Sequence, residues 1–150
     1  MQLKDAWRNI VRPLYQRPKR IQVAALCYRG KGDKRKVLLV TSRDTGRWIV
    51  PKGWLVDGLD AKGSAVQEAW EEAGVKPAKV SKSAIGSFDY DKRLKGGLPV
   101  PVEAQVYAIE VGDVANDFPE ADERTRKWVS PEEAARMVSE PGLQELLRAV

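Results

Sequence analysis

Three glutamates, Glu68, Glu71 and Glu72, lie close together in a segment whose alanines recur every four residues, the spacing of an α-helix. On a helix that turns by about 100° per residue, their side chains project within one arc of roughly 100°. Carboxylates at this spacing repel each other and are stabilised by nearby cations. Mg²⁺ prefers such oxygen ligands and commonly bridges them to phosphate groups. The three residues are therefore candidate metal ligands, with a solvated acidic helix face as the alternative.

Local signals predict the elements that would position these glutamates. A helix is expected over residues 61–73, because Asp60 is suited to cap its start and Gly74 stands where a helix commonly ends. A short strand over residues 47–50 is expected to deliver the chain to Gly53.

The segment 51–75 resembles the Nudix box, the loop–helix signature of the Nudix hydrolases, written G-x5-E-x7-R-E-U-x-E-E-x-G-U with U a bulky aliphatic residue. The preceding TSRDTGRWIVPKG is most similar to the diphosphoinositol-polyphosphate and diadenosine-polyphosphate branch of that family. The similarity covers roughly residues 20–75 and extends more thinly to about 140. The matching box residues are Gly53, Glu68, Glu71, Glu72, Gly74 and Val75, with Ala69 a weaker match at an aliphatic position.

Two box positions depart from the pattern. Leu59 stands where the family has Glu, and Gln67 stands where it has Arg. In the family these two charges are commonly described as an ion pair that braces the loop against the helix. Since both charges are lost together, neither is left unpaired. We expect a neutral replacement of the brace, in a partly buried loop–helix contact where Leu59→Glu alone would be destabilising.

The resemblance implies a metal site and a reaction. Gly53 would lend a backbone carbonyl to Mg²⁺, with Mn²⁺ as the alternative metal, and Glu68, Glu71 and Glu72 would be both metal ligands and catalytic residues. A metal-activated water would attack a phosphorus atom of a pyrophosphate bridge. The carboxylate that accepts the proton is left open. A further acidic ligand outside the box is expected from either Glu103 or Glu120, and the FPE motif at residues 118–120 favours Glu120.

A phosphorylated substrate also needs cations and, for a nucleotide, an aromatic surface. Arginine suits bidentate phosphate contacts and lysine supplies a point charge. Trp54, directly after Gly53, is the candidate for stacking on a base, whereas Trp48 lies in an apolar strand and is expected in the core. The candidate substrate-binding residues are Arg20, Arg43, Arg47, Lys52, Trp54, Lys92 and Arg93.

Composition excludes several other classes of protein. The chain has 150 residues, 43% hydrophobic and 31% charged, which is typical of one globular domain. No apolar run is long enough for a membrane-spanning helix, and the N-terminus lacks the apolar region of a secretory signal. The absence of histidine rules out Ser-His-Asp and Cys-His catalysis. Cys27 is the only cysteine, lies in an apolar run and is expected in the core, which fits a cytoplasmic location.

The remaining pattern predicts an α/β fold with a mixed sheet, and the resemblance implies a Nudix-type α/β/α sandwich. Residues 1–20 are expected to form a basic N-terminal arm or short helix, and residues 21–150 a single domain. Ser130 and Pro131 signal the start of a helix over 131–137, and a further short helix is expected from Pro141. The expected strands are 21–28, 37–41, 47–50, one within 79–93, 101–111 and 126–129.

Three functions are compatible with these features. The first is a metal-dependent pyrophosphohydrolase acting on a dinucleoside polyphosphate, a diphosphoinositol polyphosphate or a related nucleoside diphosphate. The second is a non-catalytic Nudix-fold ligand sensor, suggested by the departures at Leu59 and Gln67. The third is a nucleic-acid binder, suggested by the net charge of +5 but not favoured, because the cations follow no recognition motif. A small phosphorylated partner is expected, no membrane partner is expected, and a homo-oligomer is left open.

Overall fold

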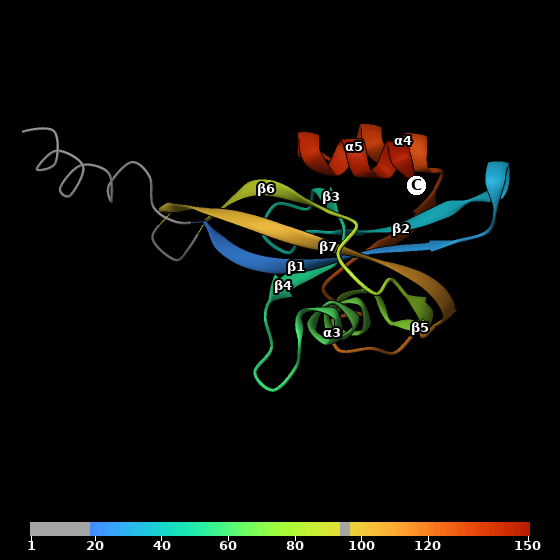
Figure 1. The fold of residues 1–150 in the computed structure, drawn as a ribbon, viewed down its shortest axis with the longest axis horizontal. Helices are drawn as coiled ribbons and strands as arrows, with labels where there is room; N and C mark the ends of the chain where they lie inside the picture. The colour runs from blue at the N-terminus through green and yellow to red at the C-terminus, as the bar shows by residue number, and fades with distance from the viewer. Residues whose placement is uncertain (1–18, 94–96) are drawn as a thin grey trace, which may run out of the picture.

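A mixed sheet of eight strands runs through the middle of the molecule, with helices on both of its faces (Figure 1). The computed structural model describes residues 19–93 and 97–150. The strand order is β3-β2-β1-β7-β5, while β4 pairs with β1, β6 with β7 and β8 with β2. Only the central β1–β7 pair is parallel, and every other pairing among the described strands is antiparallel. The predicted α/β/α sandwich with a mixed sheet is confirmed.

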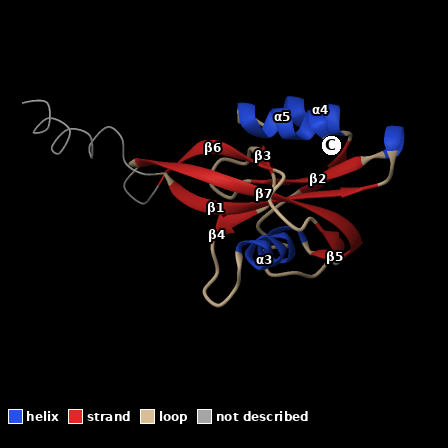
Figure 2. Ribbon diagram, viewed as in Figure 1, coloured by secondary structure: helices blue, strands red, loops and turns tan. Residues whose placement is uncertain are grey.

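Figure 2 shows α3 on one side of the sheet and α4 and α5 on the other. The elements are β1 (Arg20–Arg29), a 3-10 turn (Gly32–Lys34), β2 (Lys36–Thr41), β3 (Trp48–Ile49), β4 (Lys52–Trp54), α3 (Ala61–Ala73), β5 (Val75–Val80), β6 (Gly86–Arg93), β7 (Pro99–Val114), β8 (Arg126–Val129), α4 (Pro131–Met137) and α5 (Pro141–Ala149).

Two strands escaped the sequence prediction. The segment that follows α3 contains two strands, β5 and β6, where only one was expected. β5 carries Pro77 and two exposed lysines, Lys76 and Lys79, which obscure its pattern. It pairs with β7 as an edge strand and shifts register around that proline. β4 was also missed, since three residues with Gly53 at their centre give no strand signal. β4 matters most for function because it pairs with β1 and places Gly53 opposite Val23.

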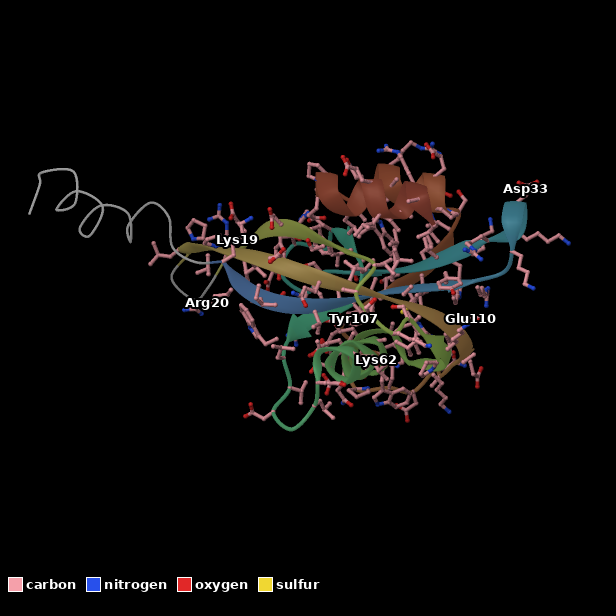
Figure 3. All side chains as sticks on the ribbon, in the orientation of Figure 1. Lys19, Arg20, Asp33, Lys62, Tyr107 and Glu110 are labelled. Atoms are coloured by element: carbon pink, nitrogen blue, oxygen red, sulfur yellow. The ribbon has the colours of Figure 1, made fainter. Side chains whose placement is uncertain are left out.

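The core lies on both faces of the two central strands. β1 is buried continuously from Gln22 to Cys27, as expected of a strand covered on both faces. β7 instead alternates buried residues with the partly exposed Glu103 and Gln105 over its first half. Tyr107, labelled in Figure 3, packs with Val23 and Ala65 on the α3 side. Cys27 is fully buried as predicted, and burial raises the pKa of its thiol to about 12, which makes it unreactive. Trp48 is partly buried against the core.

The ends of the sheet lie far from each other. Lys19 and Arg20 are at one end, where β1 begins, and Asp33 is at the tip of the β1–β2 connection at the other (Figure 3). The predicted N-terminal arm lies outside the described residues up to residue 18, and Arg20 already belongs to β1. Within the described part of the chain, no helix is long and apolar enough to cross a membrane.

Candidate active site

Helix α3 is fixed at both ends by the predicted caps. The Asp60 carboxylate accepts a hydrogen bond of 2.7 Å from the Gly63 N–H at the first turn. Gly74 ends the helix in the left-handed region, at φ 68°, where glycine carries no steric penalty. Ala65, Ala69 and Ala73 are buried against the sheet. The small residues let the helix approach the sheet closely, and the glutamates on the adjacent face point toward β4.

A cavity of about 460 Å³ opens between this face of α3, β4 and the loop that precedes β8. Acidic residues form one part of its lining and basic residues form another, so the site is strongly polar. The lining contains Gly53, Glu68, Glu71, Glu72 and Glu120, together with Arg43, Lys52, Lys92, Arg124, Trp54, Gln22, Ser42, Asp44, Leu55 and Val56. The cavity thus brings together every predicted metal-site residue and four of the seven predicted substrate-binding residues.

Glu68 and Gly53 are in unusually close contact. A Cβ atom added to Gly53 would lie 2.4 Å from the Glu68 carboxyl carbon and 2.4 and 2.8 Å from its two oxygens. Glycine leaves room for the Glu68 carboxyl to approach the backbone, and an added Cβ would displace the flexible end of that side chain. This contact holds the Glu68 carboxyl against β4, on the cavity wall.

Replacing Gly53 by alanine is expected to push the Glu68 carboxylate out of this position while leaving the fold intact, because the far end of a glutamate side chain can rotate away. We expect turnover to fall by about 10²-fold, as for other small misplacements of reacting groups. Enzyme assays and a melting curve measured side by side test this. Alanine replacement of Gly142, which lies against Phe88 in the core, serves as a control that costs stability without touching the cavity.

Glu72 is 5% exposed, and both of its oxygens already accept hydrogen bonds. Oε2 accepts from the Lys52 backbone N–H at 3.0 Å, and Oε1 accepts from Arg124 Nη2 at 2.8 Å. Burial raises the pKa of Glu72, although Arg124 and Lys52 oppose that effect. The side chain therefore ties α3 to β4 and to the loop before β8.

Among the glutamates of the cavity, Glu68 has the most strongly shifted pKa. Burial, followed by the negative charges of Glu72, Glu71 and Glu120, raises the pKa of Glu68 to about 7. Glu71 accepts a hydrogen bond of 2.9 Å from the amide of Gln67 on the preceding turn. Uncompensated negative charge therefore accumulates on the Glu68 side of the cavity.

The donor chemistry of this cluster fits a hard divalent cation. The carboxylates of Glu68 and Glu71 and the carbonyl of Gly53 are all oxygen donors. Burial and the neighbouring negative charges raise the pKa of Glu68, so a bound cation would stabilise its ionised form. Among the residues that the structure describes, however, no three His, Cys, Asp or Glu side chains already converge as a metal-holding group. Arg124 occupies the space between Glu72 and Glu120 instead.

The basic residues of the cavity differ in their exposure and in the groups that they already contact. Arg43 is exposed and pairs at 3.4 Å with both Glu120 and Glu123. Burial lowers the pKa of Lys52, whose ammonium lies 5.1 Å from the centre of the Tyr90 ring. Tyr90 in turn donates a short hydrogen bond to the buried Gln22. Lys52 therefore presents a charge that is poorly solvated and held in place by an aromatic ring.

A second cavity of about 240 Å³ adjoins the first and shares four of its lining residues. Two predicted substrate-binding residues, Arg47 and Arg93, line this second cavity, and Lys52 and Lys92 line both. Arg20 lines neither cavity and stays a prediction that the geometry does not support. Glu103, the other candidate ligand outside the box, accepts from Ser87 in a separate cavity beside Lys19.

Trp54 lines the first cavity and is 38% exposed, as a stacking surface requires. Its neighbour Leu55 is 50% exposed and lines the same cavity. The two form an apolar rim on a lining that is otherwise charged. This rim is available to the face of a base or a sugar.

Sequence reasoning missed Arg124 and Gln22. Arg124 lies in the loop directly before β8, and no local signal says that its side chain meets Glu72. Gln22 reads as one polar residue in an apolar strand. The Arg124 contact depends on the pairing of β8 with β2, and the Gln22–Tyr90 contact depends on the pairing of β1 and β6 with β7.

The expected contact at Leu59 is wrong in one respect. Leu59 is 45% exposed, because it lies in the turn before Asp60, so the site is not partly buried. Gln67 makes its side-chain hydrogen bond to Glu71. The neutral pair is therefore not a buried substitute for a salt bridge.

This geometry changes the expected effect of restoring the charges. Leu59→Glu should alter the free energy of unfolding by less than about 0.5 kcal/mol, as is usual for an exposed site. Gln67→Arg should be tolerated because an arginine there can pair with Glu71 one turn away. A double-mutant cycle by urea denaturation measures the coupling, which we expect to be below about 0.5 kcal/mol. A gain in turnover of about a hundredfold with Leu59→Glu alone, worth roughly 2.7 kcal/mol of barrier, would instead assign the missing glutamate to the chemistry.

Comparison with known proteins gives a consistent result. A family model described as the NUDIX domain matches residues 18–150. Diphosphoinositol polyphosphate phosphohydrolase 3-beta of Bos taurus is 30% identical over 119 residues, covering 78% of this chain and 68% of the relative. The human 3-alpha protein matches with the same identity and coverage.

Two solved structures have similar folds. The crystal structure of the C. elegans Ap4A hydrolase aligns with a TM-score of 0.60 and 22% identity, covering 87% of this chain and 94% of that one. The NUDIX domain of Shewanella oneidensis NrtR, crystallised with ADP ribose, aligns with a TM-score of 0.64 and 17% identity, covering 99% and 96% of the two chains. At these identities the structural matches establish the fold.

Proposed function

Because the chain belongs to the NUDIX family of hydrolases, we propose that it is a Mg²⁺-dependent pyrophosphohydrolase that cleaves a phosphoanhydride in a polyphosphorylated metabolite. Dinucleoside polyphosphates and diphosphoinositol polyphosphates are the leading substrates. They correspond to the names of the Ap4A hydrolase and of the diphosphoinositol polyphosphate phosphohydrolases to which the chain is similar. Mn²⁺ is the alternative metal.

The observation that carries this proposal is the division of one cavity into an acidic and a basic side. The Glu68–Glu71 side needs a cation, whereas Lys52 and Lys92 offer positive charge to an anion. A metal ion alone would leave these lysines without a role, and an anion alone would be repelled by the glutamates. A complex of a divalent metal with a phosphate chain satisfies both sides.

Different residues of the cavity would bind the metal and the phosphate chain. Glu68 and Glu71, with the Gly53 carbonyl, would hold the metal, and Lys52 and Lys92 would orient the phosphate chain. When bound, Mg²⁺ lowers the pKa of water and offsets charge on phosphate oxygens. Glu68 and Glu71 are both candidate proton acceptors, since both carboxylates lie on the acidic side of the cavity.

The test is a panel assay with excess Mg²⁺ or Mn²⁺. Diadenosine polyphosphates, diphosphoinositol polyphosphates, ADP-ribose and nucleoside triphosphates should be incubated with the enzyme, and the released phosphates measured. Cleavage of at least one class, abolished by chelator, is the expected result. No product from any of them at micromolar enzyme would refute the proposal. Trp54→Ala should then weaken dinucleotide cleavage more than inositol cleavage, if the ring stacks on a base.

A second candidate, a non-catalytic ligand sensor, is favoured by one observation. Both oxygens of Glu72 are already bonded to groups of the protein. A sensor carrying Glu68→Gln should still bind phosphorylated ligands and would have no turnover to lose. Isothermal titration with a non-hydrolysed ligand, run beside the panel assay, separates the two functions.

The proposed partner is thus a small phosphorylated molecule. A cytoplasmic location is proposed because Cys27 is the only cysteine, so the chain forms no intrachain disulfide. Nucleic acid is not favoured. Binding to generic single or double strands tighter than about micromolar at 0.15 M salt would reverse that judgement.

A further inference from the structure

Arg124 is buried among the candidate metal ligands. Its side chain is 7% exposed, although a guanidinium remains charged at any ordinary pH. Its Nη2 donates to Glu72 Oε1 at 2.8 Å and to Glu120 Oε1 at 3.0 Å. Its Nε donates to the same Glu120 oxygen at 3.1 Å, and its Nη1 donates to the Thr41 carbonyl at 2.8 Å. One cation thus links two acidic residues of the cavity to β2.

The loop that carries Arg124 is anchored at several points. The Glu120 N–H donates to the Glu71 carbonyl at 3.0 Å, which attaches the loop to the end of α3. Thr125 and Thr41 are joined by two hydrogen bonds, one in each direction, at 2.9 and 3.0 Å. The guanidinium is therefore held in position by the fold.

This position matters for any divalent ion that enters the cavity. Glu72 Oε1 faces Arg124, and Glu72 Oε2 is held by the Lys52 N–H. A metal ion bound to Glu72 would meet a guanidinium on the same carboxylate, and like charges at contact distance repel strongly where water is excluded. Without Arg124, the buried Glu72 carboxylate and the partly buried Glu120 carboxylate would lie near each other with no cation between them.

We propose that Arg124 is a positioning residue that acts as a resident counter-cation, holding Glu72 and Glu120 in the metal-free protein and competing with the divalent metal ion for Glu72. This inference rests on the proposed metal-dependent function. Arg124 would then have two opposite effects: it stabilises the metal-free site and it weakens metal binding. Glu68 and Glu71, which Arg124 does not contact, remain the open donors.

The test measures Mn²⁺ binding and metal-free stability on the full chain. Free Mn²⁺ is followed by electron paramagnetic resonance for the wild type, Arg124→Met and Arg124→Lys, and melting curves are recorded in chelator and in Mn²⁺. For Arg124→Met we expect the Mn²⁺ dissociation constant to fall by about fivefold or more, a typical coupling between sites. We expect its melting temperature in chelator to drop by about 5 °C, with a larger rise on adding Mn²⁺ than in the wild type. Lysine keeps the charge but lacks the planar fork of donors that spans Glu72, Glu120 and Thr41, so it should give intermediate values.

Arg126→Met is the matched control. Arg126 lies two residues further on, donates to the carbonyls of Ala73 and Ala115, and packs over Phe118. Its loss should lower the melting temperature but leave the Mn²⁺ dissociation constant within about twofold, since no carboxylate of the cavity is released.

The possible outcomes distinguish a failure of this inference from a failure of the proposed function. If the wild type binds Mn²⁺ and Arg124→Met binds it no more tightly, the competition is refuted and the proposed function survives. If the wild type binds no Mn²⁺ at millimolar concentration, both proposals fall. If Arg124→Met does not fold, the lysine variant decides, because unchanged or weaker Mn²⁺ binding by that variant overturns the inference.

Discussion

Glu68→Gln is expected to inactivate the protein and to stabilise it at the same time. Turnover should fall by about 10²–10⁴-fold, because the change removes both a candidate metal ligand and a general base. In chelator at pH 8, the free energy of unfolding should rise by about 1–2 kcal/mol, the value of the raised pKa after allowance for the partial exposure of the side chain. Gln keeps the shape of the side chain and removes the charge that its neighbours repel.

The direction of the Glu68 pKa shift determines how the stability of the protein changes with pH. The pKa of Glu68 is about 7 in the folded protein and about 4.5 in the unfolded chain. The folded state therefore binds more protons between these values, so this group's contribution is fully present below pH 4.5 and is lost as the pH rises through 7. The difference in stability between Glu68→Gln and the wild type should be small at pH 5 and largest at pH 8. Urea denaturation in chelator at both pH values measures it, and equal differences at the two would contradict the raised pKa.

Glu72→Gln is expected to inactivate the protein and to destabilise it. The new amide can still accept from the Lys52 N–H, but its NH₂ group faces Arg124 or leaves that guanidinium without one of its acceptors. We expect a loss of about 1–3 kcal/mol, which is the cost of an unsatisfied buried polar group. Glutamine carries no charge, so the variant no longer bears the cost of burying the Glu72 carboxylate. The loss should therefore stay below that of a broken buried ion pair. Turnover should fall by about 10²-fold or more because α3 is no longer tied through Arg124 to the loop before β8.

Glu145→Gln is the control for both variants. Glu145 is exposed on α5, on the other side of the sheet from α3. Its replacement should change stability by less than about 0.5 kcal/mol and leave turnover unaltered. Two glutamates four residues apart on one helix should therefore give stability changes of opposite sign, whereas a simple acidic surface would give the same small change at each position.

Much of this site could be predicted because its parts are local. The caps of α3 at Asp60 and Gly74, the shared face of the three glutamates and the placement of Gly53 ahead of the helix each depend on residues within about one helix length. The similarity of the segment to a known box supplied the chemistry. The cavity accordingly contains all the residues predicted to bind the metal.

The features that escaped prediction depend on the tertiary fold. β5 was missed because an edge strand tolerates Pro77 and exposed lysines that weaken the pattern. Arg124 reaches Glu72 only because β8 pairs with β2, and the periodicity of a single strand does not specify its partner. The exposure of Leu59 likewise depends on the path of a loop. Arg20 was carried over from the family pattern, and this fold puts it at the end of the sheet (Figure 3).

The parallel pairing of the first and seventh strands also constrains how the chain reaches this fold. Ile21 pairs with Glu103 and Cys27 with Ile109, so the centre of the sheet joins the two halves of the sequence. During synthesis β1 has no partner on that side until the residues of β7 have emerged, and its apolar residues stay exposed meanwhile. Contacts of such long sequence separation slow folding because a large loop must close first. Chains that end before residue 99 should therefore aggregate, even though they already contain the complete acidic helix.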